Sequence, residues 1–182
     1  MDVHKLIDLY KAGERQFERV NLHQANLSGI NLSGANFVEA DLSGANLSQA
    51  NLNGCNFSRA NLTDADLSGA SLIGANLHEV NLIGAYLIRA NLKNSNLSRA
   101  DLRSANLVLS NLLGANLSEA EMSGADLSDA NLKQTTLIGS NVIEAELSGV
   151  DITEAMITEQ EITGTFVRIG LSHKWITWAG CH

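Results

Sequence analysis

Apolar residues recur at every fifth position over most of this chain. From Phe17 to Ile162, thirty consecutive five-residue units each carry an apolar residue at the centre, without an insertion or deletion. Leu fills 22 of these 30 centres, and Ala stands two residues before the centre in 19 units. The position between them is usually Asn or Asp. This period matches neither the 3.6-residue period of an amphipathic helix nor the two-residue alternation of a long strand.

Each unit is predicted to be a very short extended segment followed by a turn. In an extended segment, the centre and the residue two positions before it point to one side, and the residue between them points away. Twelve of the 15 glycines stand two positions after a centre, which indicates a turn residue with positive φ. Because Gln24, Glu39, Arg59 and Asn94 occupy the same position, we expect some corners to use a different turn that tolerates a side chain.

Short segments that always turn the same way form coils, and stacked coils form a solenoid. The number of units in one coil is indicated by Phe17, Phe37 and Phe57, which lie 20 residues apart. With four units in each coil, these three rings would stack on one face.

The unit Ala-(Asn/Asp)-Leu-X-X, as in residues 25–29 and 65–69, resembles the pentapeptide-repeat proteins. The resemblance covers about 150 of the 182 residues, and residues 6–17 are similar to the lead-in of cyanobacterial members. It implies an all-β fold, a right-handed quadrilateral β-helix (solenoid). Thirty units, four to a coil, would give about 7.5 coils.

A solenoid has two ends with unpaired strand edges, and these need caps. Residues 1–13 are predicted to contain a short capping helix with Asp2 as its N-cap, because apolar residues recur there at helical spacing. Residues 14–165 would form the β-helix. Residues 166–182 contain both tryptophans and are interpreted as an aromatic C-terminal cap or as a dimer contact.

Composition and charge narrow the class of protein. The chain is 45% hydrophobic and lacks proline, which argues against disorder. Its 20 acidic and 12 basic residues give a net charge of −8, so we expect no direct contact with nucleic acid. No apolar run approaches the ~18–20 residues of a membrane span, and two cysteines fit a reducing compartment. We therefore expect a soluble, cytoplasmic protein without a membrane partner.

Arrangements of residues that carry catalysis are nearly absent. His4, His23 and His78 show no metal-ligand spacing, and no serine has a neighbouring His and Asp that would activate it. The chain also lacks a phosphate loop and a dinucleotide-binding fingerprint, and Cys55 is interpreted as a substitute for Ala. We therefore expect no enzyme activity, no cofactor and no metal.

A group of apolar residues stands at outward-facing positions where Ser, Gly or Asn is usual. With four units per coil, the unit centred on Leu87 lies directly next to the unit centred on Leu107. Their outward apolar residues would then form one patch, which we interpret as a partner surface or as tolerated drift along a rigid rod. The candidate patch comprises Ile83, Tyr86, Ile88, Val108, Leu109 and Leu113.

Carboxylates are concentrated in the last third of the repeats. Ten lie between Glu119 and Glu161 against one base, Lys133. The resemblance implies a possible role here, since some members of the family resemble DNA in size and charge and bind DNA gyrase. Four units per coil would spread the ten over all four faces, so a solvated acidic face is favoured over DNA mimicry. The candidate acidic surface comprises Glu121, Asp126, Glu144 and Glu146.

The sequence thus favours a non-enzymatic protein-binding scaffold or regulator that presents the rigid walls of a β-solenoid. The alternative is a DNA-mimicking protein that binds DNA gyrase. A homodimer, formed through the C-terminal tail or through the apolar patch, is left open. The sequence does not identify the protein partner.

Overall fold

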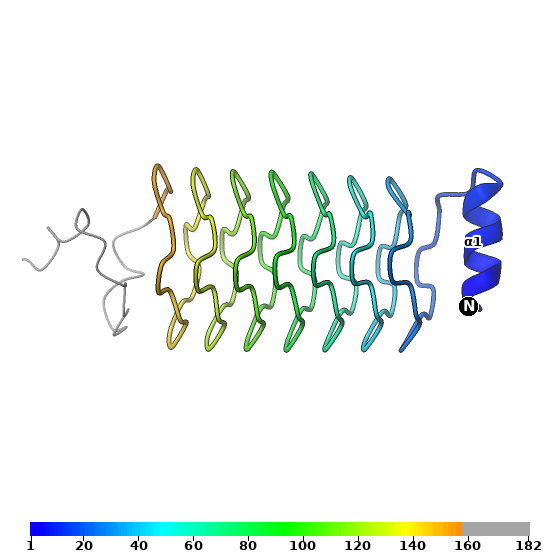
Figure 1. The fold of residues 1–182 in the computed structure, drawn as a ribbon, viewed down its shortest axis with the longest axis horizontal. Coiled ribbons are helices and arrows are strands. Elements are labelled where there is room, and N and C mark those ends of the chain that lie inside the picture. The colour runs from blue at the N-terminus through cyan, green and yellow to red at the C-terminus, as the bar shows by residue number, and fades with distance from the viewer. Residues whose placement is uncertain (158–182) are drawn as a thin grey trace, which may run out of the picture.

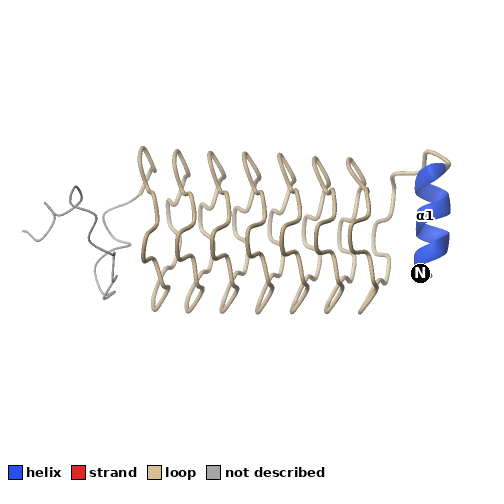
Figure 2. Ribbon diagram, in the orientation of Figure 1, coloured by secondary structure: helices blue, strands red, loops and turns tan. Residues whose placement is uncertain are grey.

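The structure is a computed structural model and describes residues 1–157. A single helix, α1 (Val3–Lys11), is followed by a stack of similar coils (Figure 1). Within residues 1–157, no strand is longer than an isolated bridge residue, so the coils are drawn as loops in Figure 2. In the same part of the chain, no helix is long and apolar enough to cross a membrane.

Each coil contains four five-residue units, as the spacing of the phenylalanines predicts. Parallel bridges join residues that are 20 apart, from Gln16↔Asn36 to Thr136↔Met156. These bridges cover (156 − 16)/20 = 7 steps from coil to coil. The units beyond residue 157, and with them the expected total of 7.5 coils, lie outside the described residues.

The four walls of the stack are named after one centre each. The Phe57 face holds the units centred on residues 17, 37, 57 and onward in steps of 20. The Leu82, Leu87 and Leu92 faces follow in chain order around the coil, so the Leu87 face lies opposite the Phe57 face. Corners lie two residues after each centre.

Backbone hydrogen bonds account for four of the five N–H groups in a typical unit. In the unit centred on Leu47, the N–H groups of the centre and of the corner residue donate to the next coil at 2.7 and 2.9 Å. Asn46 donates to the previous coil at 2.9 Å, and the following Ala closes the turn onto the carbonyl of Leu47 at 3.1 Å. The fifth N–H, of Ser48, donates to Oδ1 of Asn46 at 3.0 Å. Asn or Asp before the centre therefore supplies the acceptor that the backbone lacks.

All corners use the same backbone conformation, so the expectation of a different turn at some corners was wrong. Each of the 28 corner residues from position 19 to position 154 has positive φ, including 17 that are not glycine. The values for Gln24, Glu39, Arg59 and Asn94 lie between 55° and 57°. Positive φ at the third residue of a β-turn is the feature that a type II turn requires. The coil requires it everywhere because the same ladder bonds must form on both sides of each corner.

The interior is filled by the centres and by the small residues two positions before them. Leu62, Leu72 and Leu92 are fully buried, like most centres up to residue 132. The rings of Phe17, Phe37 and Phe57 stack, with centroids 5.6 and 5.3 Å apart, as predicted. Because every coil repeats the same side chains at the same depth, the core runs as a continuous column along the stack.

Helix α1 lies across the N-terminal end of this column (Figure 1). The carboxylate of Asp2 accepts hydrogen bonds from the N–H groups of His4 and Lys5, as expected for an N-cap. The side chain of Leu6 is completely buried, and Tyr10 Oη donates to the carbonyl of Ser33 at 2.9 Å. The predicted cap or dimer contact over residues 166–182 lies outside the described residues.

Candidate functional site

The candidate patch is centred on two neighbouring coils of the Leu87 face. Tyr86 forms a parallel bridge with Asn106, and the N–H of Arg89 donates to the carbonyl of Val108 at 3.0 Å. These bonds place Tyr86 opposite Asn106, Ile88 opposite Val108 and Arg89 opposite Leu109, so the outward apolar residues of the candidate patch belong to neighbouring coils.

Exposure differs among the six residues of the patch. Tyr86 is 50% exposed and Leu109 is 43% exposed, whereas Ile88 and Val108 between them are half-buried. Ile83 and Leu113 belong to the Leu82 and Leu92 faces, so they border the patch around its two corners and do not lie on the same wall.

Tyr86 replaces the hydrogen-bond acceptor that most units carry before the centre. In the next coil, Asn106 accepts the N–H of Val108 through Oδ1 at 3.1 Å. A tyrosine ring offers no oxygen at this point, and within residues 1–157 the N–H of Ile88 has no hydrogen-bond acceptor. The chain thus loses one hydrogen bond and gains an exposed aromatic ring.

Leu109 departs from the repeat in a second way. Its φ of 60° is similar to that of the other corners, but among the corner residues from position 19 to position 154 it alone is neither glycine nor polar. The corners before and after it on the same edge are Arg89 and Asp129, both charged. An exposed leucine at this corner has no evident benefit for the fold.

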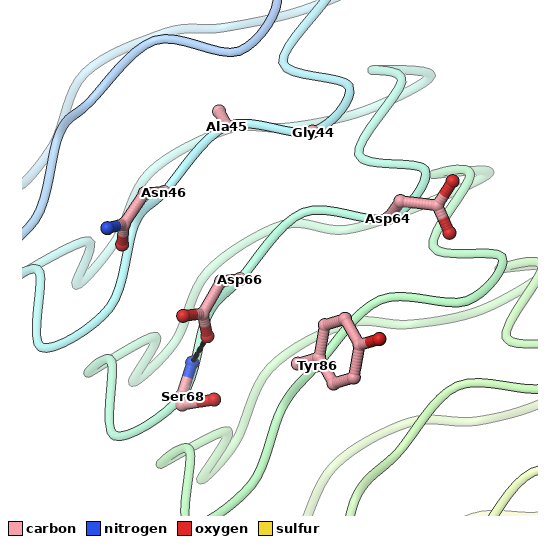
Figure 3. A pocket seen from close by; sticks show the side chains of 7 residues that line it. All are labelled: Gly44, Ala45, Asn46, Asp64, Asp66, Ser68 and Tyr86. Atoms are coloured by element: carbon pink, nitrogen blue, oxygen red, sulfur yellow. Dashed lines mark hydrogen bonds between the residues drawn. The ribbon is translucent and has the colours of Figure 1, made fainter.

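A shallow hollow of about 370 Å³ adjoins the patch (Figure 3). The ring of Tyr86 lines one side, Asp66 lies opposite it in the previous coil, and Asp64 lies at the corner before Asp66. Gly44 and Ala45 line the opposite side. Gly44 has no side chain and the side chain of Ala45 is buried, so neither residue fills the hollow from that side.

The four residues of the candidate acidic surface lie on two walls. Glu121 is on the Leu82 face and Glu144 is at the corner that follows that face, whereas Asp126 and Glu146 form a bridged pair on the Leu87 face. Glu121, Asp126 and Glu146 each accept the backbone N–H two residues further on, at 2.9–3.2 Å. These three carboxylates thus have the same local role as the asparagines of other units.

A ladder of alternating charges was missed by reasoning from the sequence. It occupies the corner after the Phe57 face, and Glu39 accepts from Arg19 at 2.7 Å and pairs with Arg59 at 2.9 Å. The hydrogen bond from Arg19 holds the pKa of Glu39 below its ordinary value. Comparing the residues two positions after the centres at intervals of 20 would have revealed this ladder, an alternation of Arg and Glu, in the sequence. Its six members are Arg19, Glu39, Arg59, Glu79, Arg99 and Glu119.

Groups that could carry chemistry are not brought together in the described part of the chain. Residues 1–157 contain no cluster of three His, Cys, Asp or Glu side chains that could hold a metal ion. Cys55 is buried, its Sγ–H donates to the carbonyl of Leu32 at 3.0 Å, and burial raises the pKa of its thiol to about 11. A thiol in this environment stays protonated near neutral pH and is a poor nucleophile.

Comparison with protein families found a match along most of the chain. The model for pentapeptide repeats matches in eight copies, over residues 16–54, 55–94, 95–134 and 130–159. Comparison with curated proteins gave no match.

Solved structures provide the second comparison. HetL from Nostoc sp. strain PCC 7120, a pentapeptide repeat protein involved in heterocyst differentiation regulation, is 27% identical with a TM-score of 0.65, and the match covers 86% of this chain and 92% of HetL. Rfr23 from Cyanothece 51142 is 27% identical with a TM-score of 0.35, covering 85% of this chain and 99% of Rfr23. QnrB1, a plasmid-mediated fluoroquinolone resistance protein, is 18% identical with a TM-score of 0.43. The match covers 80% of this chain and 92% of QnrB1.

Proposed function

The chain belongs to the pentapeptide-repeat family, whose members form right-handed quadrilateral β-helices, and from this premise we propose that it is a non-enzymatic, cytoplasmic scaffold or regulator. It binds a protein partner through the apolar patch of the Leu87 face. The rigid wall holds the exposed side chains in fixed positions, so little conformational entropy is lost when the partner binds.

The observation that carries this proposal is the pair of departures from the repeat at Tyr86 and Leu109. Tyr86 leaves the N–H of Ile88 without an acceptor within residues 1–157, and Leu109 places an apolar side chain at a corner where the other residues from 19 to 154 are glycine or polar. The first change removes a hydrogen bond, and both changes put apolar surface in contact with water. Positions that break a local rule without a structural benefit are typical of functional sites.

The likeness to HetL supports a regulatory role. That protein is described as involved in the regulation of heterocyst differentiation, and it shares 27% of its residues and the coil architecture with this chain. Regulation through protein contacts needs a defined surface and no catalytic group, and the patch provides such a surface.

The alternative, a DNA mimic that binds DNA gyrase, has less support. A mimic needs carboxylates in rows that imitate phosphates, whereas the candidate acidic residues lie on two walls and three of them bond the local backbone. A gyrase supercoiling assay separates the two functions. Inhibition at micromolar protein that is lost in the variant E121Q/D126N/E144Q/E146Q would favour the mimic, and we expect no inhibition.

The proposed function is tested by affinity capture with matched variants. In Y86N/L109N, both positions receive a residue that the repeat uses elsewhere, so we expect the fold to persist. Val38→Ser removes an apolar side chain from the opposite Phe57 face and is the control. A partner retained by the wild type and by V38S should be lost from Y86N/L109N. The purified partner should likewise bind the wild type and V38S more tightly than Y86N/L109N. Equal retention by all three proteins would contradict the proposal.

A further inference from the structure

The apolar patch has carboxylates at its N-terminal side. Asp66 forms a parallel bridge with Tyr86, and Asp64 lies at the corner before Asp66; both residues line the same hollow as Tyr86, with the Asp66 carboxylate turned to Ser68 and the Asp64 carboxylate turned away from the ring (Figure 3). A cation that approaches this side of the patch would be attracted by two carboxylates and by an exposed aromatic ring. Both groups attract a lysine ammonium or an arginine guanidinium.

A second pair of carboxylates lies at the C-terminal side of the patch. Asp126 forms a parallel bridge with Asn106, and Asp129 follows Leu109 at the next corner on the same edge. Within residues 1–157, none of the four carboxylates forms an ion pair. Arg89 is the one base on this stretch of the Leu87 face. The apolar patch is therefore bracketed by negative charge that the chain itself does not neutralise.

From this arrangement we infer that the partner docks with a segment that carries basic side chains on both sides of an apolar stretch. The inference rests on the proposed function and adds the chemistry of the partner to it. Asp66 and Asp126 are three coil steps apart, roughly 14 Å at ~4.8 Å per step. Basic residues about nine or ten positions apart on a helix, or about four apart on an extended segment, match this spacing.

A second copy of the chain is a poor occupant of the same surface. In a two-fold dimer formed by this patch, each copy would present the same surface to the other. The carboxylates beside Tyr86 would then approach the carboxylates of the other copy, and like charges across an interface are unfavourable. Charge complementarity thus selects a basic partner over self-association.

The experiment begins with a displayed library of random 16-residue peptides. The library is selected on wild-type protein after counter-selection on Y86N/L109N, so the recovered peptides need the patch. We expect Lys or Arg on both sides of an apolar stretch in these peptides. Sedimentation of the wild type at increasing concentration runs in parallel. A dimer that Y86N/L109N abolishes would assign the patch to a second copy and overturn the inference.

The recovered peptide is then measured against charge variants by fluorescence anisotropy. D66N/D126N removes one carboxylate from each side, and asparagine retains the acceptor that Asp66 and Asp126 provide at 2.9 Å. D41N/D151N makes the same change on the Leu82 and Leu92 faces and is the control. We expect D66N/D126N to weaken binding about fivefold or more at low salt and to reduce its salt dependence, with D41N/D151N unchanged.

The outcomes separate the inference from the proposed function. Patch-dependent peptides without basic residues, or binding that D66N/D126N leaves unchanged, would overturn the inference and leave the protein-binding surface in place. Recovery of no peptide that needs Tyr86 and Leu109 would count against the proposed function itself.

Discussion

Tyr86 occupies the position at which most units carry Asn or Asp. In those units the side-chain oxygen accepts the one N–H of the unit that has no backbone partner, as Asn46 does for Ser48 at 3.0 Å. Conservative changes at this position are therefore those that retain an oxygen at the same distance from the backbone. Asp and Asn satisfy this condition, and tyrosine does not.

We predict that Tyr86→Asn stabilises the protein. Asparagine would accept the N–H of Ile88, and a neutral hydrogen bond contributes about 0.5–1.5 kcal/mol. Urea unfolding should show a free energy of unfolding higher by about that amount. The reverse change one coil on, Asn106→Tyr, removes the acceptor of Val108 and should destabilise. A loss of stability in Y86N would mean that the ring is needed for the fold.

Asp41 leads to a prediction about pH. Hydrogen bonds from the hydroxyl of Ser43 at 2.6 Å and from its N–H at 3.1 Å lower the pKa of this carboxyl below its ordinary value. A carboxyl with a lowered pKa in the folded state stabilises the fold above its unfolded pKa, and this contribution is lost as pH falls through the folded pKa. Stability should therefore be steady near neutral pH and decrease below about pH 4.

The variant D41N tests the assignment to this residue. Asparagine accepts the same hydrogen bonds without titrating, so D41N should lose less stability than the wild type between pH 5 and pH 3. Thermal melts over this range measure the difference. Identical pH profiles would show that the acid sensitivity comes from other carboxyls, such as Asp101, whose pKa the Arg103 side chain lowers.

The element of this fold is the coil, and its units are not independent. A unit donates two backbone bonds to the next coil and one to the previous coil, as the unit centred on Leu47 shows. A single unit therefore has no stable conformation without its neighbours at a distance of 20 residues. The charge ladder at the corner after the Phe57 face follows the same interval, because corner residues 20 positions apart lie next to each other in adjacent coils and are close enough to pair.

The packing of the coil predicts different effects on stability for two adjacent residues, the inward-facing Leu92 and the outward-facing Lys93. Leu92 is completely buried, and Leu92→Ala should lower the free energy of unfolding by ~2–5 kcal/mol because the column of side chains cannot collapse around the cavity. Lys93 is exposed on the Leu92 face, and Lys93→Ala should change the free energy by less than ~0.5 kcal/mol. Chemical denaturation of both variants measures the contrast, and equal effects would show that the assignment of inward and outward positions is mistaken.

At the scale of the whole molecule, the two ends of the stack need to be covered. Helix α1 packs its buried Leu6 against the first coil at the N-terminal end. At the other end of the described residues, the centre Ile157, at an inward-facing position, is 36% exposed. We propose that residues 166–182 act as the cap there, since a solenoid end that is left open promotes aggregation.

Deletion of residues 166–182 tests this proposal. If the segment is a cap, the truncated protein should aggregate or unfold first at its C-terminal end, which sedimentation and hydrogen exchange would detect. If the segment is a dimer contact, truncation should give a stable monomer and the intact protein should show a concentration-dependent mass. A soluble, fully folded monomer without these residues would contradict the cap.

The repeat by itself determined the architecture of this protein. A strict five-residue period fixes which side chains face inward, and Phe17, Phe37 and Phe57 at intervals of 20 fix four units per coil. The proximity of the units centred on Leu87 and Leu107 also followed, because adjacent coils are related by a constant interval of 20 residues. Local periodicity was sufficient here because each contact recurs at a constant distance in sequence.

Only the tertiary structure decided the backbone conformation of the corners and the hydrogen bond that is lost at the patch. The glycines pointed to positive φ at some corners, but the hydrogen bonds between coils impose it on every corner, including Leu109. The structure also showed that the N–H of Ile88 depends on residue 86, and that Asp64 and Asp66 share a hollow with Tyr86. These features depend on bonds and surfaces formed between coils, which a single five-residue unit does not contain.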